Sequence, residues 1–219
     1  LAVATEALFA AAWLENTPPG RYQHQEEEWL NQLKPWLLVR NGALGSGYFP
    51  RLEIGASGGG WAPGIHHYYE IHNRRESDPS LFREDEILDG GFQQWILFGR
   101  VDPWDSDFSR TLMLYDRHIR KRAAWGGLGY LRYNEDAYGL NHAGGAWPLL
   151  SAERALVALA RGEPWQSHLE FIENSATSTG MLGEQDTLSA RPLAWSHAAY
   201  LILKRSIREG RSYYQSSFD

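Results

Sequence analysis

Apolar side chains recur every three or four residues along most of the chain, which is the period of an amphipathic helix. In Gln23–Val39, for example, Leu30, Leu33 and Leu37 lie on one side, and the acidic run Glu26–Glu28 falls in the first half. The same pattern predicts helices at Leu1–Glu15, Gln23–Val39, Glu84–Phe98, Asp107–Arg120, Leu149–Arg161, Pro164–Ser175 and Pro192–Arg208. Because no alternation of strands and helices accompanies these segments, the expected fold class is mainly α.

Proline, glycine and charge set several of the expected helix boundaries. The Ala-rich segment Leu1–Glu15 has apolar residues on most faces, so we expect it to be buried on several sides and to stop at the following NTPPG. Pro35 predicts a kink or an early end of the second helix, whereas Pro164 and Pro192 lie near helix starts. The basic run Arg117–Arg122 is expected to form the last turn of a helix.

A long segment without helical periodicity separates the second and third predicted helices. It runs from Asn41 to about Arg83 and contains NGALGSGYFPRLEIG, which suits a short hairpin around glycine turns, and GASGGGWAPG. Structureless loops of this length are uncommon, and they are usually functional or contain small strands. We therefore expect a loop-rich insertion at this point of an otherwise helical chain.

The composition is that of a globular chain and disfavours several classes of function. Of its 219 residues, 43% are hydrophobic and 22% are charged, which argues against disorder. A net charge of −6 without a long basic stripe disfavours nucleic-acid binding. No apolar run approaches the roughly 20 residues that a membrane helix requires. Cysteine is absent, so disulfides and a thiol nucleophile are excluded; the compartment stays open, with a secreted or periplasmic location favoured over a cytoplasmic one.

Aromatic residues are abundant, and their meaning is ambiguous on composition alone. They make up 13% of the chain, including 10 Trp and 11 Tyr, and they occur in Gly-rich loops as well as in helices. Planar rings on loops suit the apolar faces of sugars, whereas large rings also fill large cores. Both interpretations stand at this stage.

The histidine-rich stretch HHYYEIH offers four groups that could bind zinc, namely His66, His67, Glu70 and His72. The spacing H-E-x-x-H is absent, and the segment resembles a loop or a strand, in which neighbouring side chains point to opposite faces. A structural or sugar-facing role is therefore favoured, and neither a metal nor a cofactor is expected.

Two glycine-rich segments carry candidate binding residues. GGLGYLRYNEDAYG contains Arg132, Glu135 and Asp136, and a guanidinium is a good donor to sugar hydroxyls or to a carboxylate. A surface loop with a local Arg–Asp pair is the alternative. Trp147, just before a predicted helix, is either a stacking platform or a core anchor.

Glu184 is the candidate for catalysis. It lies beside Gln185 on a glycine-flanked loop ahead of the last predicted helix, where it is either a solvated surface charge or a group at the mouth of a pocket. Hydrolysis at a glycosidic carbon generally needs two carboxyl groups, one that protonates the leaving oxygen and one that activates water or attacks. A catalytic Glu184 would therefore need a partner.

The order of several motifs resembles family 15 of the glycoside hydrolases, the glucoamylase and glucodextranase family. The resemblance covers roughly residues 1–208, and the motifs that carry it are NGALGSGYFPR, DGGF…FGR, RYNEDAY, AWPLL…ER and EQ…PLAWSHA. Each is weak alone, but their order is specific. The resemblance implies an (α/α)6 barrel in which six inner helices are ringed by six outer ones. Seven helices are too few for twelve, so residues 1–219 are expected to form the C-terminal half, or slightly more, of one such catalytic domain.

The resemblance also implies roles for individual residues. Glu184 falls on the family's general base, and Ser189 falls on the hydroxyl that orients that carboxylate. Arg132 resembles a donor to sugar hydroxyls, with Asp136 as its partner. The remaining residues that resemble substrate-binding groups are Tyr133, Trp147 and Trp195.

The family's general acid lies in a Trp-Glu-Glu motif, which this chain lacks. The resemblance therefore implies that the acid lies upstream of Leu1 and that the N-terminal half of the domain is a partner, in the same polypeptide or as a separate chain. The expected activity is that of an inverting exo-α-glucosidase, which releases β-glucose from α-glucans of the starch or dextran type. Two alternatives remain, a non-catalytic carbohydrate-binding homologue and a glucosyl-transferring relative.

Overall fold

The computed structural model describes Ala7 and residues 21–51, 68–187 and 189–214. The predicted helix Leu1–Glu15 lies outside the described residues, apart from Ala7, and so do His66 and His67. The described helices are α2 (Arg21–Leu37), α3 (Gln93–Leu97), α4 (Ser106–His118), α5 (Pro148–Ala160), α6 (Gln166–Ser175) and α7 (Ala194–Glu209), with short 3-10 turns η1 (Glu84–Glu86) and η2 (Leu140–His142).

Local signals explain where most of these helices begin and end. The Asp105 carboxylate accepts hydrogen bonds from the backbone N–H groups of Asp107 and Phe108 and caps the start of α4. Pro148 occupies the first turn of α5, where its missing N–H has no helical partner to lose. α7 is followed by Gly210, whose φ of 70° is left-handed and ends the helix. Pro35 lies inside the last turn of α2, which ends two residues later as an early end predicts.

One predicted helix and one predicted helix end are wrong. The segment Glu84–Phe98 is not continuous, because η1 is followed by a turn in which the Asp89 carboxylate accepts from the Gly91 N–H before α3 begins. This bond and two adjacent glycines favour a turn over a helix. The basic run Arg117–Arg122 is divided, since α4 ends at His118 and Arg120–Arg122 forms strand β3.

Two short antiparallel strand pairs lie among the helices. β1 (Tyr68–Glu70) pairs with β2 (Leu81–Arg83) inside the expected loop-rich insertion. The glycine-rich segment before them makes two isolated bridges, Val39 to Tyr48 and Gly42 to Gly45, as a short hairpin predicts. β3 pairs with β4 (Leu128–Tyr130), with Arg120 opposite Tyr130 and Arg122 opposite Leu128.

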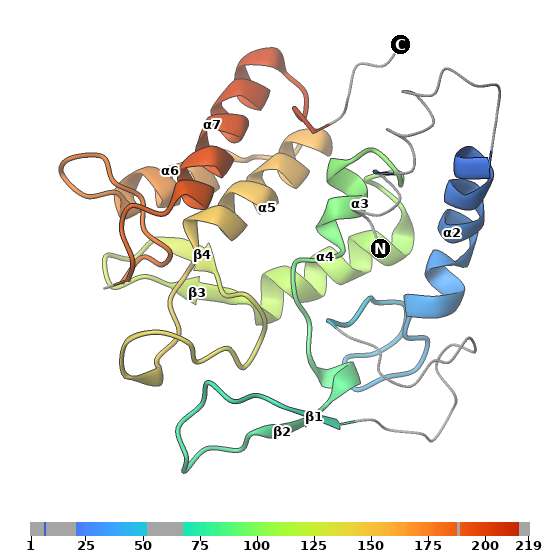
Figure 1. Cartoon of the computed structure of the whole chain (residues 1–219), viewed down its shortest axis with the longest axis horizontal. Helices are drawn as coiled ribbons and strands as arrows, with labels where there is room; N and C mark the ends of the chain where they lie inside the picture. Colours follow the sequence, from blue (N-terminus) through green and yellow to red (C-terminus); the bar gives the residue numbers. More distant parts are fainter. Residues whose placement is uncertain (1–6, 8–20, 52–67, 188, 215–219) are drawn as a thin grey trace.

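Helix α5 forms the centre of the described helices. Figure 1 shows it beside α6 and α7 on one side and α3 on the other, and it contacts all three. Ala155, Leu156 and Val157 are at most 1% exposed and belong to one extended hydrophobic core. α2 stands further away, where Leu33 reaches this core and Lys34 forms ion pairs with acidic residues at the start of α4.

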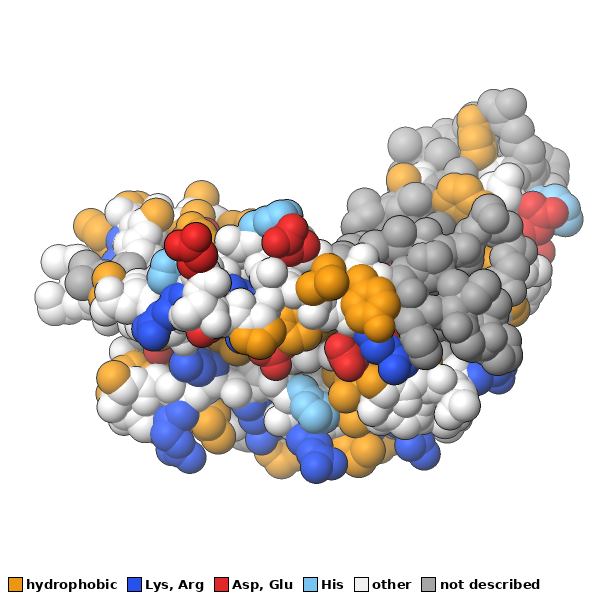
Figure 2. All heavy atoms as spheres, turned by 90° about the horizontal axis from the view of Figure 1, so that it is seen from below, with side chains coloured by type: hydrophobic (Ala, Val, Ile, Leu, Met, Phe, Trp, Pro, Cys, Tyr) orange, Lys and Arg blue, Asp and Glu red, His pale blue; other side chains and the backbone are white. Residues whose placement is uncertain are grey.

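None of the helices in the described part of the chain is both long and apolar enough to cross a bilayer. On the face seen in Figure 2, Lys and Arg side chains alternate with apolar and neutral ones. Exposed apolar residues also occur on α7, where Trp195 is 63% and Leu201 is 64% exposed. In contrast, Ala199 and Leu203 on the other side of α7 are buried in the core.

Candidate active site

Glu184 lies on the loop between α6 and α7, and backbone hydrogen bonds hold this loop in shape. The Glu184 N–H donates to the Ala190 carbonyl at 3.1 Å, and the Leu193 N–H donates to the Leu182 carbonyl at 2.9 Å. From the first turn of α7, the Ser196 hydroxyl donates to the Gly183 carbonyl at 2.8 Å. The position of Glu184 is therefore fixed both by the loop and by the helix that follows it.

The Glu184 carboxylate is half-buried and borders a cavity of about 460 Å³. The Tyr138 hydroxyl donates to its Oε2 atom at 3.3 Å. The other lining residues come from the loop before α5, from the Glu184 loop and from the turn after β1: Asn73, Ala137, Gly139, Leu140, His142, Gln185, Ser189 and Ala190. Glu184 is the single carboxylate among these lining residues.

Gln185 and Ser189 hold the backbone next to Glu184. The buried Gln185 side chain donates to the Tyr138 carbonyl at 2.8 Å and so joins the two loops that face each other across the cavity. The Ser189 hydroxyl accepts from the Gln185 N–H at 2.9 Å and donates to the Gln185 carbonyl at 3.1 Å. The expected bond from Ser189 to the Glu184 carboxylate is thus replaced by bonds to the adjacent backbone, because the serine closes the Glu184 loop on itself.

Asp186 adds a second connection between the two loops. Its backbone N–H donates to the Ala146 carbonyl, and its carboxylate accepts from the Ala146 N–H, both at 2.8 Å. Burial raises the pKa of Asp186, although the hydrogen bonds to its carboxylate oppose that shift. This reciprocal pair fixes the Glu184 loop against the residue that precedes Trp147.

Arg132 and Asp136 form a bidentate pair beside the cavity. Arg132 Nε and Nη2 each lie 2.8 Å from a different Asp136 oxygen. The buried Asp136 also accepts from the Asn73 side chain at 2.7 Å and from the Tyr138 N–H at 3.1 Å. The hydrogen bonds from Arg132 to the Asp136 carboxylate raise the pKa of Arg132, although burial opposes that shift. The expected Arg–Asp partnership is therefore present, and it also holds Tyr138, the residue that contacts Glu184.

Aromatic rings surround the Arg132 guanidinium. Its Cζ atom lies 4.5 Å from the centroid of Tyr138 and 5.4 Å from that of Trp147. Trp147 is buried, and its indole nitrogen has no hydrogen-bond partner within the described part of the chain. Trp147 is not among the residues that line the Glu184 cavity.

Tyr133 and Trp195 are not among the residues that line the Glu184 cavity. Tyr133 is buried in a small cluster with Ile71 and Ile87, and the Arg51 guanidinium lies 3.8 Å from its ring centroid. Its hydroxyl accepts from Asn73 at 2.9 Å, and its ring centroid lies 5.5 Å from the Arg132 Cζ atom, so it adjoins the Arg132–Asp136 pair. Trp195 is exposed in the first turn of α7 and is not part of the lining of the Glu184 cavity, because the turn directs it outward.

The histidine-rich stretch gives no metal centre in its described part. His72 Nδ1 lies 3.7 Å from Glu70 Oε2, and both side chains are largely exposed. The residues that the structure describes contain no cluster of three or more His, Cys, Asp or Glu side chains that could hold a metal ion.

Sequence reasoning missed Tyr138 and Asn73, which bring the site together. Tyr138 lies two residues after Asp136 and could have been noticed as the aromatic that ends the RYNEDAY segment. Asn73 lies 60 and 63 positions away from its partners Tyr133 and Asp136, so only the folded chain reveals it.

Comparison with known proteins identifies the relatives of this arrangement. A search with models of known protein families finds no match. A glucoamylase from Clostridium sp. (strain G0005) is 30% identical over 200 residues, which cover 84% of this chain. The crystal structure of a bacterial glucoamylase complexed with acarbose superimposes with a TM-score of 0.84 at 26% identity over 98% of this chain. The chain is related to the glucoamylases.

A further solved structure, of a wild-type glycosidase, shares the fold at 21% identity, with a TM-score of 0.60 over 93% of this chain. The described helices thus match part of an (α/α)6 barrel, and the predicted fold class is confirmed. The chain spans 27% of the length of its curated glucoamylase relative and 34% of that of the bacterial glucoamylase structure.

Proposed function

We propose that residues 1–219 form the C-terminal part of the catalytic domain of an inverting, exo-acting α-glucosidase. This enzyme would remove terminal glucose from an α-glucan and release it as β-glucose. The observation that carries the proposal is the Glu184 carboxylate, which borders an open cavity and is held by Tyr138 and by a loop closed on itself. The similarity to glucoamylases over most of the chain supports the substrate class.

In this proposal Glu184 is the general base. A water molecule between its carboxylate and the anomeric carbon would lose a proton to Glu184 as it attacks the face opposite the leaving group. The Tyr138 hydroxyl, 3.3 Å from Glu184 Oε2, would keep the carboxylate oriented toward that water. The product would then have the opposite anomeric configuration to the substrate.

Arg132 is proposed to donate to sugar hydroxyls. Its two bonds to Asp136 fix the plane of the guanidinium and leave other N–H groups of the fork for a ligand. Trp147 is proposed to lie against the sugar or to donate its unpaired indole N–H. The aromatic surroundings would exclude water from one side of the pocket.

The general acid is proposed to lie outside residues 1–219, on the N-terminal part of the same domain. Support comes from the cavity itself, where Glu184 is the single lining carboxylate, and from the partial coverage of the relatives. An inverting enzyme places its two carboxyl groups about 6.5–9.5 Å apart, so a second segment has to approach Glu184 that closely.

The exposed apolar side of α7 is proposed to pack against that N-terminal part. Trp195 and Leu201 are large apolar side chains that are 63% and 64% exposed. Exposed apolar surface of this kind often marks an interface. We expect this chain alone to aggregate and to become soluble when it is produced together with the N-terminal part. A monomeric chain with a cooperative unfolding transition would contradict this.

One observation favours a second candidate, a non-catalytic carbohydrate-binding homologue, because Glu184 is the single carboxylate among the described residues that line the cavity and inverting hydrolysis needs two. Proton NMR of the complete protein with maltose, isomaltose and trehalose separates the two. The first proposal predicts β-glucose as the initial product. Hydrolysis with α-glucose as the initial product would exclude inversion, an α-linked transfer product would indicate a glucosyltransferase, and no turnover of any substrate would favour the binding homologue.

A further inference from the structure

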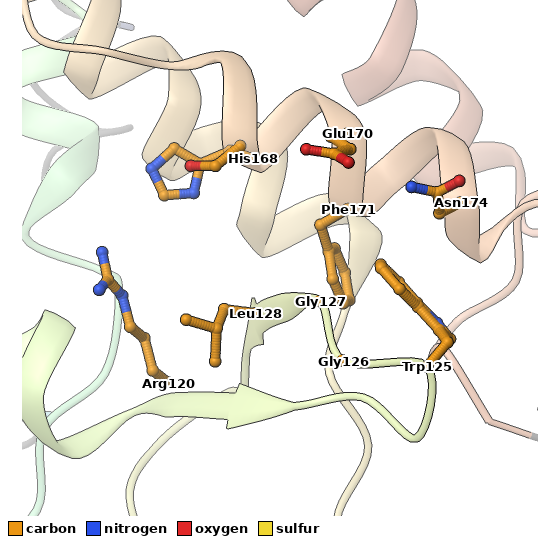
Figure 3. A pocket seen from close by; sticks show the side chains of 10 residues that line it. Arg120, Trp125, Gly126, Gly127, Leu128, His168, Glu170, Phe171 and Asn174 are labelled. Carbon is orange, nitrogen blue, oxygen red and sulfur yellow. The ribbon is translucent and has the colours of Figure 1, made fainter.

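A second hollow lies between the β3–β4 hairpin and helix α6, and it has a volume of about 830 Å³. Ligand sites commonly have volumes of ~300–1,000 Å³. Its lining shares no residue with that of the Glu184 cavity. Figure 3 shows Trp125 and Phe171 at one end, Arg120 and His168 at the other, and Leu128 between them.

Trp125 forms an exposed platform at this hollow. Its side chain is 44% exposed, and its ring stacks on Phe171 with a centroid distance of 5.4 Å and an interplanar angle of 29°. A Cβ atom on Gly127 would lie 2.0 Å from the Trp125 ring, and one on Gly129 would lie 2.3 Å from Phe171. The two glycines therefore let both rings lie against the hairpin backbone, which fixes the platform.

Helix α6 supplies the polar side of the hollow. Ser167, Glu170 and Asn174 are exposed, and their spacing of three and four residues places them on one face of the helix. Within the described residues, the side chains of Glu170 and Asn174 make no hydrogen bond or ion pair, so their donors and acceptors are free for a ligand. Figure 3 shows both extending from α6 above the two stacked rings.

The far end of the hollow is rigid. His168 is 5% exposed, and burial lowers its pKa to about 4, which keeps the ring neutral at physiological pH. Its ring lies 5.7 Å from that of Tyr130. The Arg120 Nε donates to the Tyr130 hydroxyl at 3.1 Å, which fixes the guanidinium beside the histidine.

A pyranose ring presents C–H groups on one face and hydroxyls around its edge, and this hollow matches both features. The Trp125 ring offers a flat apolar surface, while the carboxylate, amide and hydroxyl of α6 offer acceptors and donors at the edge of that surface. We propose that the hollow is a second carbohydrate site, which holds a segment of an α-glucan chain away from the Glu184 cavity. The choice of an α-glucan rests on the proposed function.

The site would retain a polymer while its chain end is processed elsewhere. A short substrate that occupies only the Glu184 cavity would not contact the hollow, because the two linings are separate. Loss of the platform should therefore weaken action on long chains and leave action on maltose unchanged.

The test is affinity electrophoresis of the complete protein in gels that contain amylopectin, dextran or a soluble β-glucan, all in a Glu184→Gln background to prevent digestion. Trp125→Ala should weaken retardation by amylopectin about tenfold, since aromatic stacking and apolar burial contribute on that order. Gly127→Ala should do the same, because it displaces the ring without removing it. Trp104→Ala is the matched control, since Trp104 is 57% exposed and lies outside the hollow.

The second test is kinetic and uses protein in which Glu184 is not substituted. Trp125→Ala should raise KM for soluble starch about tenfold and leave kcat unchanged. KM for maltose should also stay unchanged. Unchanged retardation and unchanged starch KM in Trp125→Ala would overturn the second site, and equal retardation by the β-glucan would overturn the ligand class. Trp125-dependent retardation by amylopectin in a protein that hydrolyses no α-glucan would refute the proposed function and leave the second site standing.

Discussion

Among the bidentate Arg–Asp pairs of the described residues, Arg154–Asp116 and Arg132–Asp136 differ in what surrounds the guanidinium. Arg154 on α5 binds Asp116 on α4 at 3.1 and 2.9 Å, and its side chain is 7% exposed. Arg132 binds Asp136 at 2.8 Å through both nitrogens, but its side chain is 35% exposed and lies beside the aromatic rings of the candidate active site. Because the pairing is the same, access to the guanidinium distinguishes the structural pair from the pair that we propose binds the sugar.

The largest expected effect is on the structural pair. Asp116→Ala would remove the bidentate partner of the buried Arg154 and leave it the longer contact with Glu163, at 3.5 Å, so we expect the free energy of unfolding to fall by about 3 kcal/mol. Asp136→Ala would leave a guanidinium that water can reach, and the loss should be only ~1–2 kcal/mol. Urea unfolding of the complete protein measures both, and equal losses would contradict the distinction.

The structural pair also predicts a pH dependence. Burial raises the pKa of Asp116, but hydrogen bonds and charge from Arg154, with the Tyr130 hydroxyl, outweigh burial and hold the pKa below its usual value. A lowered carboxyl pKa stabilises the fold above the unfolded pKa of about 3.9, and this stabilisation is lost as the pH falls further. Acid unfolding of Asp116→Asn should therefore depend less steeply on pH below 4 than that of the wild type.

A third carboxylate, Glu153, lacks a cationic partner in the described part of the chain and extends the comparison. Burial raises its pKa to about 7; a hydrogen bond from Gln94 opposes this shift, and the charge of Asp89 adds to it. Because the pKa of Glu153 is raised in the folded state, its contribution to the free energy of unfolding is fully present below the unfolded pKa. That contribution is lost as the pH rises through about 7. We expect Glu153→Gln to exceed the wild type in stability at pH 8 by on the order of 2 kcal/mol.

Thermal unfolding between pH 5 and 8 measures this gain, with Glu27→Gln on the exposed side of α2 as the control. The difference between Glu153→Gln and the wild type should grow with pH. A difference that stays constant between pH 5 and 8 would show that burial does not raise the pKa of Glu153.

The binding pair predicts a smaller effect, on function. Arg132→Lys keeps the charge but loses the planar fork that meets Asp136 and a sugar hydroxyl together. We expect KM for maltose to rise about tenfold with a small change in kcat, and stability to change by under ~1 kcal/mol. Arg205→Lys on the exposed side of α7 is the control. An equal rise in KM for Arg205→Lys would contradict the proposed role of Arg132 in binding the sugar.

The sequence predicted α4 to α7 well because each has local signals, such as the Asp105 cap, Pro148 in the first turn of α5 and Gly210 after α7. It failed at Glu84–Phe98, where the bond from the Gly91 N–H to Asp89 ends the helical pattern. It also missed β3 and β4, since three-residue strands are too short to show an alternation.

For the candidate site, the family resemblance implied Asp136 as the partner of Arg132, and the two side chains do pair. The actual bonds of Ser189 and the outward position of Trp195 depend on how a loop and a helix turn fold, which no local pattern encodes. Tyr138 reaches Glu184 across 46 positions, so its contact required the fold.

The central claim is that Glu184 removes a proton from the attacking water, and azide rescue of Glu184→Ala tests it most directly. Azide is already an anion and needs no base, so it can replace water in the variant. We expect turnover of an activated α-glucoside to fall by about 10²–10⁴-fold and to recover when azide is added, with β-glucosyl azide as the product. Turnover close to the wild type without azide would contradict it.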